Sequence, residues 1–434
     1  MKSFFRFLIV GLGMLCSIQA KAQLNFTPQY MNRAEYRHGY QSLADTGQKA
    51  AAFVSQRTRL TGEYKAERYK IVIGIQDIRT WGSVGNAAID TKGLMSVSEA
   101  YAEINLSRKI LARLGRQILA YDDDRIIGSL DWAMQSRRHD LALLQYKDST
   151  LTLHGGFAFN QDKEQFKTTI YTVQANYKTF QYLWANKQFK KSDVSLLVLN
   201  NGLQFGKKDT VSKPDTITVF SQTTGIRATY KGDIFSGVVY GYYQFGKDGN
   251  NNPLSAYCAS AEASCKLGKL VSFTLGAEIL SGTSQLSKST TNRSFTPFYG
   301  TNHRHNGYMD YFYLGNHLNT VGLFDKYAKL NFSYKQFLLG LNAHFFDTAE
   351  KVRNTKAAAP NSSMPSYLGT ELDITIGCKV ADEISLQAGY SQMFGSSTIM
   401  MLKGGNTRET SNWAYLMVIV RPGKVKWPKV GLKM

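Results

Sequence analysis

The segment "FVSQRTRLTGEY", residues 53–64, decides how the rest of the chain is interpreted. Successive side chains of a strand point to opposite faces, so Arg57 and Arg59 lie on one side and Leu60 and Tyr64 on the other. A soluble sheet would pack its apolar face in a core. A membrane barrel would turn that face to lipid and its arginines toward water.

The same alternation recurs along the chain, in residues 149–160, 271–280 and 368–380. In the last of these, Leu368 and Leu372 share the apolar face. A period of two over such lengths predicts half-buried strands. With 8 Pro against 37 Gly, the composition also suits many strands joined by tight turns.

Short and long connections alternate between these strands, which is typical of a bacterial outer-membrane barrel with short periplasmic turns and long extracellular loops. The count predicts an all-β, antiparallel transmembrane barrel of about 18 strands, wide enough to leave an aqueous lumen. Residues 168–177 also alternate, but an odd strand count would leave the termini on opposite sides. We therefore assign them to the fourth outer loop, as a hairpin extension. The long loops are expected at 39–51, 81–94, 120–135, 160–176, 203–217, 247–255, 282–325, 347–366 and 395–410.

The two ends of the chain resemble export and tail segments rather than barrel strands. Residues 1–22 have a basic start, an apolar stretch and the cleavage site Ala20-Lys21-Ala22, so they predict a secretory signal peptide. No later stretch approaches the roughly 20 apolar residues of a spanning helix. The barrel is then expected over 23–422, followed by a basic periplasmic tail at 423–434.

The formal charge of the chain is +20, of which three units belong to the predicted signal peptide. Such an excess attracts polyanions, among them acidic polysaccharide and lipopolysaccharide phosphates. Export makes nucleic acid the poorest of these partners. A generally basic exterior is the alternative that composition leaves open.

Chemical motifs point away from catalysis and from a bound cofactor. The chain has no Gly-x-Ser-x-Gly, Gly-Lys-Ser/Thr or His-Glu-x-x-His motif. One loop gathers His303, His305, Asp310 and His317, which we interpret as a segment folded near the channel mouth rather than a metal site. Three aspartates precede Arg125, and an Asp–Arg network ordering the third outer loop is the favoured reading over a calcium site.

Several segments together form a recognisable pattern. The most specific is "RLGRQILAYDDDRIIGSLDWAMQSRRHD", residues 113–140. The others are "QDIRTWG" (76–82), "SEAYAEINL" (98–106), "TNHRHNGYMDYFYLGN" (301–316) and "GTELDITIGCKV" (369–380). With these segments the chain resembles the alginate-export family of outer-membrane porins. The resemblance implies an 18-stranded monomeric barrel with an electropositive constriction through which anionic polysaccharide leaves the cell.

The resemblance also implies a set of pore-lining, substrate-binding residues. A guanidinium group matches a carboxylate bidentately, and inward carboxylates would keep a polyanion from binding too tightly to leave. Arg113 and Arg116 lie an odd number of positions apart, so on a regular strand their side chains point to opposite faces. Only one of them can then face inward. The expected arginines are Arg33, Arg57, Arg59, Arg79, Arg113, Arg116, Arg125 and Arg138, and their partners are Asp77, Glu99, Glu103, Asp131 and Asp140.

Two departures from the family pattern bear on function. The turn that carries a long pore plug in alginate exporters is here the short Ala381–Glu383, and the last strand stops near Arg421-Pro422 without an aromatic assembly signal. The channel could then pass smaller or different anions. Trp184 and Trp413 are expected in the aromatic belts at the lipid interfaces, with Tyr182 and Tyr415 beside them.

The sequence thus predicts an outer-membrane porin passing anionic solutes, either acidic polysaccharide or oligouronates, in or out of the cell. Its expected partners are those solutes, outer-membrane lipid and lipopolysaccharide, and the barrel-assembly machinery. The alternatives are a general uptake channel for small anions or oligosaccharides, and a barrel serving as a surface scaffold or enzyme.

Overall fold

The computed structural model describes residues 23–87, 93–171, 173, 175–207, 215–313, 317, 320–359, 361–423 and 425–426. The predicted signal peptide and most of the predicted tail lie outside the described residues. None of the helices in the described part of the chain is long and apolar enough to cross a membrane.

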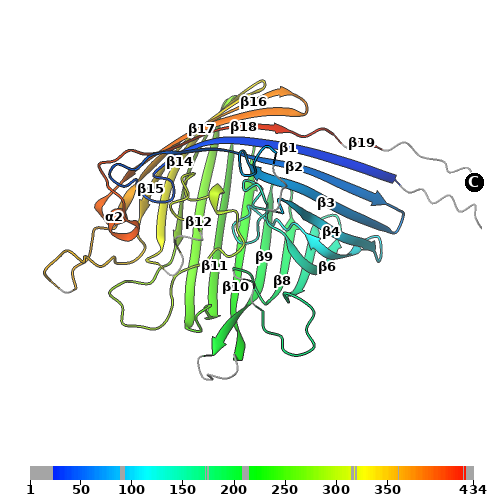
Figure 1. Ribbon diagram of the computed structural model, residues 1–434, viewed down its shortest axis with the longest axis horizontal. Helices are drawn as coiled ribbons and strands as arrows, with labels where there is room; N and C mark the ends of the chain where they lie inside the picture. The colour runs from blue at the N-terminus through cyan, green and yellow to red at the C-terminus, as the bar shows by residue number, and fades with distance from the viewer. Residues whose placement is uncertain are drawn as a thin grey trace, which may run out of the picture.

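Over these residues the chain forms a closed antiparallel barrel of 18 strands (Figure 1). Each strand pairs with the next, and β18 closes the barrel against β1 through pairs such as Ala34 with Leu416. The strands are β1 (Gln23–His38), β2 (Ala51–Lys65), β3 (Tyr69–Thr80), β4 (Met95–Asn105), β5 (Ile110–Gln117), β6 (His139–Lys147), β7 (Leu151–Phe159), β8 (Thr179–Gln188), β9 (Ser192–Lys207), β10 (Asp215–Lys231), β11 (Phe235–Lys247), β12 (Pro253–Leu267), β13 (Val271–Leu280), β14 (Leu323–Tyr334), β15 (Phe337–Asp347), β16 (Tyr367–Ala381), β17 (Ile384–Gly395) and β18 (Ser411–Val420).

Short turns gather at one end of the barrel and long loops at the other, as predicted (Figure 1). The described residues among 168–177 lie in the loop between β7 and β8, which confirms their assignment to a loop. The expected hairpin is wrong for the described residues there, where Tyr171 instead exchanges hydrogen bonds with the Gln204 side chain of β9. A two-residue strand β19 (Val425–Lys426) pairs with Asn25 and Phe26, so strand pairing resumes after Pro422.

Alternation along the strands separates a lipid face from an inner face. On β2, Arg57 is completely buried while Leu60 is 40% exposed, and on β3 Ile73 and Ile75 are exposed on the outer side. The opening segment therefore places its arginines inside the barrel. A charge facing lipid at mid-depth would cost about 2–4 kcal/mol, which favours this register.

Two expectations about the faces were wrong. Leu368 is fully buried instead of facing outward, because it lies in a β-bulge between β15 and β16. There Phe346 pairs with Gly369 and Asp347 pairs with Tyr367, so the alternation shifts at Leu368. Trp413 is 1% exposed and stacks on Tyr415 inside the barrel.

Trp184 also faces inward rather than lying in a lipid belt. It donates a hydrogen bond to Asp122 of a loop inside the barrel and packs against Tyr121, and the neighbouring Tyr182 is buried. Aromatic side chains on these strands therefore pack against loops inside the barrel and do not meet headgroups.

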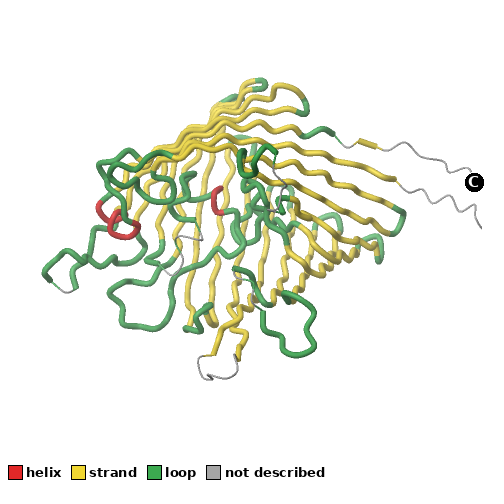
Figure 2. Tube along the Cα trace, viewed as in Figure 1, coloured by secondary structure: helices red, strands yellow, loops and turns green. Residues whose placement is uncertain are grey.

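Two long loops fold into the barrel and occupy part of its lumen (Figure 2). They are loop 118–138 and loop 281–322, and the second contains the short helix η1 (Asn302–Arg304). Backbone hydrogen bonds join them, from Gly128 to Tyr299 at 2.8 Å and from Thr301 to Asp124 at 2.8 Å. Their apolar side chains pack against the inner wall in one buried cluster, with Ile127 among its members. A seven-residue helix, α2 (Ser397–Lys403), lies in the last long loop.

Replacing Ile226, which is 55% exposed on the outer face of β10, with arginine should lower the free energy of unfolding by about 2–4 kcal/mol. The lipid would have to accommodate a charge near mid-depth. Asn331→Arg is the matched control, because Asn331 shares the inner face of β14 with Lys329 and should change the stability little. Urea titration of both variants in lipid vesicles measures the difference, and equal losses would contradict the assigned faces.

Candidate functional site

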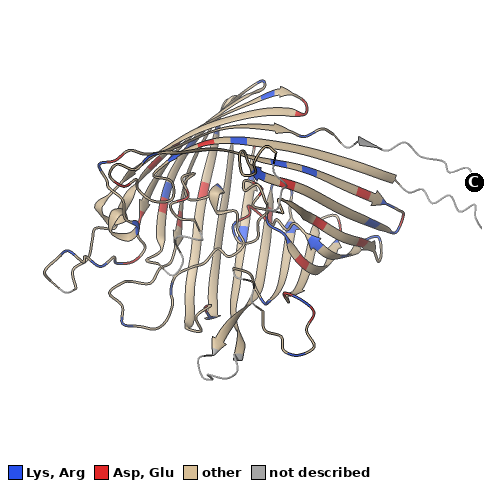
Figure 3. Ribbon diagram, in the orientation of Figure 1, with Lys and Arg blue, Asp and Glu red and all other residues tan. Residues whose placement is uncertain are grey.

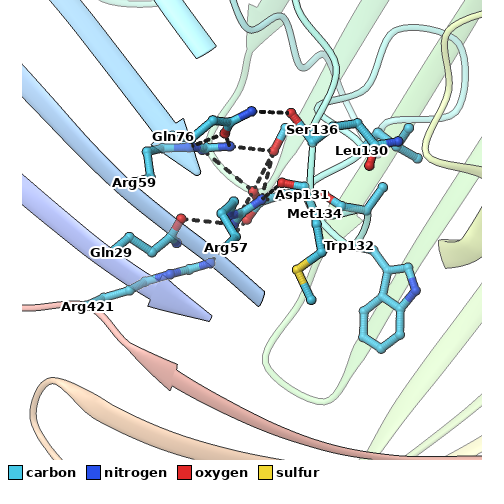
Figure 4. Close-up of polar contacts among 12 residues, drawn as sticks. Gln29, Arg57, Arg59, Gln76, Leu130, Asp131, Trp132, Met134, Ser136 and Arg421 are labelled. Carbon is cyan, nitrogen blue, oxygen red and sulfur yellow. Dashed lines mark hydrogen bonds and ion pairs between the residues drawn. The ribbon is translucent and has the colours of Figure 1, made fainter. Parts of the chain in front are cut away.

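Residues 131–136 of loop 118–138 lie against the arginines of β2 (Figure 4). Arg57 donates through Nη1 to the Met134 carbonyl at 3.1 Å and to Ser136 Oγ at 3.0 Å. Its Nη2 donates to Gln29 Oε1 and to Asp131 Oδ1, each at 2.9 Å. Arg57 thus lies beneath the loop and holds it, rather than facing open water as expected for a pore-lining group.

Arg59 lies one step along the same face and is bound by β3. Its Nε and Nη2 donate to Gln76 Oε1 at 3.0 and 2.7 Å, and Nη2 also donates to Ser136 Oγ at 2.9 Å. Gln76 is itself buried and donates to the Gln135 carbonyl at 3.2 Å. The amide orients the guanidinium group without neutralising its charge.

In the described part of the chain, Asp131 is the one carboxylate that forms ion pairs with three guanidinium groups (Figure 4). It lies 2.9 Å from Arg57, 3.9 Å from Arg59 and 3.1 Å from Arg421, which follows β18. The Asp131 side chain is 40% exposed, so its carboxylate is open to solvent on one side. We call these four residues the arginine cluster; it carries more positive than negative charge.

Arg33 and Glu35 extend this polar region on the inner face of β1. Arg33 donates to Glu35 Oε1 at 2.8 Å and to the Trp132 carbonyl at 2.8 Å, and its guanidinium lies 4.1 Å from the Trp132 ring centre. Glu35 also accepts from Arg37 at 2.7 Å and from Trp413 Nε1 at 3.0 Å. Arg33 is therefore a buried support of loop 118–138 (Figure 3 gives the charges of these strands).

Arg113 faces inward and Arg116 outward, which confirms that only one of them can point to the lumen. Arg113 donates to Glu103 Oε2 at 2.8 Å, and Lys70 lies 3.1 Å from the same carboxylate. Glu99 lies near both Arg59 and Arg113. It therefore links the charges of Arg113, Lys70 and Glu103 electrostatically to the arginine cluster.

Five predicted pore-lining residues lie elsewhere than expected. Arg116 pairs with Asp140 at 2.8 Å, and Asp140 shares the outer face of β6 with the exposed Leu144. Arg79 and Asp77 likewise pair with each other on the outer face of β3, alongside Ile75. All four are near the loop ends of their strands, where an outward charge costs only about 0–1 kcal/mol. The fifth, Arg138, is at the rim and donates to the Gln135 carbonyl at 3.2 Å.

Arg125 is almost completely buried and does not line a passage. It is 1% exposed and donates to Glu278 Oε2 at 2.7 Å and to Asn306 Oδ1 at 3.1 Å. Since Asn306 belongs to loop 281–322 and Glu278 to β13, Arg125 joins both loops to the wall. Its role is structural.

The three aspartates before Arg125 also contact strands and the second loop, as the predicted network requires. Asp123 accepts from Arg227 of β10 at 3.3 Å, and Asp124 lies 4.0 Å from Arg304. Burial raises the pKa of the Asp124 carboxyl, while the Arg304 guanidinium opposes that rise. The network ties loop 118–138 to its surroundings.

The described residues of the histidine-rich loop pack inside the barrel. Among the described residues, no group of three or more His, Cys, Asp or Glu side chains is placed to hold a metal ion. His303 bonds to Asp310 at 2.9 Å. Burial, reinforced by the nearby Arg125 and Arg304, keeps the pKa of His305 well below its usual value.

Sequence reasoning missed Arg304 and Arg421. Arg421 had no strand alternation behind it because it follows the last strand, and Arg304 lies in a loop. Gln29, Gln76 and Ser136 were missed because neutral side chains carry no charge signal, although they orient Arg57 and Arg59.

A sequence profile described as alginate export matches residues 22–399. No match was found among curated proteins. Similar solved structures include a BenF-like porin from Pseudomonas fluorescens Pf-5, with 12% identity, a TM-score of 0.60 and coverage of 94% of this chain and 99% of that one. OccAB4 of Acinetobacter baumannii has 13% identity, a TM-score of 0.59 and the same coverage. OpdK of Pseudomonas aeruginosa, crystallised with vanillate, has 10% identity, a TM-score of 0.55 and again 94% and 99% coverage.

At such low identity the solved structures establish the fold alone. The closed barrel and these likenesses define a β-barrel fold of the outer-membrane porin type. The chain belongs to the alginate-export family, whose profile covers most of its length.

Proposed function

We propose that the protein is a non-enzymatic porin for anionic solutes, namely acidic polysaccharide such as alginate or its oligouronates, which pass the arginine cluster. The observation that carries this proposal is the ratio of charges at Asp131, where three guanidinium groups meet one carboxylate. A passing carboxylate can take the place of Asp131 beside Arg59 or Arg421 without leaving a cation unpaired.

The arrangement favours passage over tight capture. Arg59 is oriented by a neutral amide, so its charge attracts an anion, while Asp131 competes for the same guanidinium groups. Conduction requires binding that is favourable enough to enter and weak enough to leave. Arg113 and Lys70 both pair with Glu103, so they offer a passing anion a second cationic site that is only partly neutralised.

Small carboxylates are the second candidate solutes. The described connection between β16 and β17 is as short as the sequence suggested, and two loops already occupy the lumen. OpdK, a barrel of the same fold, was crystallised with vanillate, a small carboxylate. We further propose that the protein works as a monomer in outer-membrane lipid and lipopolysaccharide, inserted by the barrel-assembly machinery after loss of its signal peptide.

Single-channel recordings in planar bilayers test the proposal. The wild-type channel should prefer anions and be blocked by oligouronates. Arg59→Glu should reduce or reverse the preference, because a carboxylate then replaces the cation of the arginine cluster that lies farthest from Asp131. Lys288→Glu makes the same charge change on an exposed part of a loop and should leave selectivity intact.

A wild-type channel without anion preference would refute the proposal. Block by small carboxylates but not by oligouronates would favour the second candidate.

A further inference from the structure

Arg304 stands apart from the other charged residues inside the barrel. Its side chain is 60% exposed, and its ion-pair partner Asp124 is 4.0 Å away, at the limit of an ion pair. The neighbouring lumen cations are held more closely, Arg227 by Asp123 at 3.3 Å and Lys329 by Glu262 at 3.8 Å with 26% exposure. Arg304 therefore presents the most available guanidinium group among these.

The backbone on both sides of Arg304 is fixed. Asn302 and His303 are buried, and Trp132 stacks on the His303 ring with centres 4.3 Å apart. On the other side, Asn306 donates to Glu278 at 2.8 Å and accepts from Arg125 at 3.1 Å. Because the backbone that carries Arg304 is already fixed, less conformational entropy is lost when its side chain binds a ligand.

Arg304 borders two cavities inside the barrel. The larger has a volume of about 410 Å³, and its wall includes hydroxyl and amide groups of Thr301, Asn331, Ser333 and Gln387 together with the rings of Tyr308 and Tyr415. The smaller, about 220 Å³, is lined by Arg227 and Lys329 but also by four carboxylates, those of Asp123, Glu262, Glu278 and Asp325. Volumes of a few hundred cubic ångströms are typical of small-molecule sites.

We propose that the larger cavity is a binding subsite for a single uronate residue, with the sugar carboxylate held bidentately by Arg304. Hydroxyl and amide groups of the wall suit the sugar hydroxyls, and the tyrosine rings suit the apolar face of a pyranose. This subsite rests on the proposed function, since it names where a passing oligouronate pauses.

Binding is measured with sodium galacturonate as probe, galactose as the neutral match and benzoate as a carboxylate without hydroxyls. Trp132 lines the larger cavity, so its fluorescence, isolated by comparison with Trp132→Phe, reports occupancy in purified wild-type protein. Galacturonate should bind more tightly than either comparison compound. Arg304→Ala should weaken galacturonate binding about 10-fold or more, because a charge-assisted bidentate contact is lost, and leave galactose unchanged.

Arg304→Lys keeps the charge but not the fork of donors and should fall between wild type and Arg304→Ala. Arg293→Ala, an exposed arginine in the same loop, is the matched control. Migration of the unheated barrel on gels confirms that each variant is folded.

Equal galacturonate affinity in Arg304→Ala and wild type would overturn the subsite, as would equal affinity of the wild type for galactose or benzoate. If either of these results were found while Arg59→Glu still abolished the anion preference of the channel, the proposed function would stand and only the subsite would fail. If the wild-type channel had no anion preference but galacturonate still bound through Arg304, the proposed function alone would fail.

Discussion

Asp131→Ala should raise the preference of the channel for anions over cations by roughly tenfold. The change removes the one carboxylate shared by Arg57, Arg59 and Arg421, so the arginine cluster gains a full unit of positive charge. A unit charge at 4 Å is worth about 1 kcal/mol in water and about 4 kcal/mol at an effective dielectric constant of 20. The half-exposed site lies between these limits, and 1.4 kcal/mol is a factor of about ten.

Reversal potentials in a salt gradient across a planar bilayer measure this preference. Asp131→Asn removes the same charge with little change of shape, and it should give a similar shift if charge rather than loop position is responsible. Asp45→Ala, an exposed carboxylate in loop 39–50, is the control and should leave the reversal potential unchanged. No shift in either Asp131 variant would mean that permeating ions do not pass the arginine cluster.

Arg125→Met should release the two inward loops from each other and from the wall. It leaves the carboxylate of Glu278, which is 3% exposed, without its buried cation, and breaking one partner of a buried ion pair costs about 3–5 kcal/mol. The loss should appear as local opening, because Arg125 joins the loops rather than the strands. Hydrogen exchange at the amides of Gly128 and Thr301, which bridge the loops, should accelerate by about 100-fold or more.

The double variant Arg125→Met/Glu278→Met removes both buried charges and should recover most of the protection. Arg293→Met, on the exposed surface of loop 281–322, should leave exchange unchanged. If Arg125→Met exchanges as slowly as wild type at both amides, the buried pair does not hold the loops.

Alternation and connection lengths were enough to predict the barrel, because each strand must satisfy lipid on one side and water or protein on the other. The faces of Arg57 and Leu60 follow directly from this rule. The same rule, continued from Ile75, places Asp77 on the outer face; the assumption that every charge faces the lumen misplaced it. That assumption fails near the strand ends, where an outward charge paired with its own counter-ion costs little.

Leu368 and Trp413 show a second limit of sequence patterns. A bulge near Gly369 changes the register in a way that alternation cannot reveal, since only the pairing partner defines it. In residues 412–420 both faces are apolar, so nothing in the sequence distinguishes the side that meets lipid from the side that packs on Trp132.

The sequence by itself determined the 18-stranded barrel, its family and the faces of regular strands such as β2, because a repeated two-residue period and lipid contact act locally along each strand. Only the tertiary structure decided which inner arginines hold a loop and which present charge to the lumen. Asp131, Gln76 and Arg421 come from distant parts of the chain, and their meeting depends on how loop 118–138 packs across the barrel. Such packing arises from long-range contacts whose energies no local pattern records.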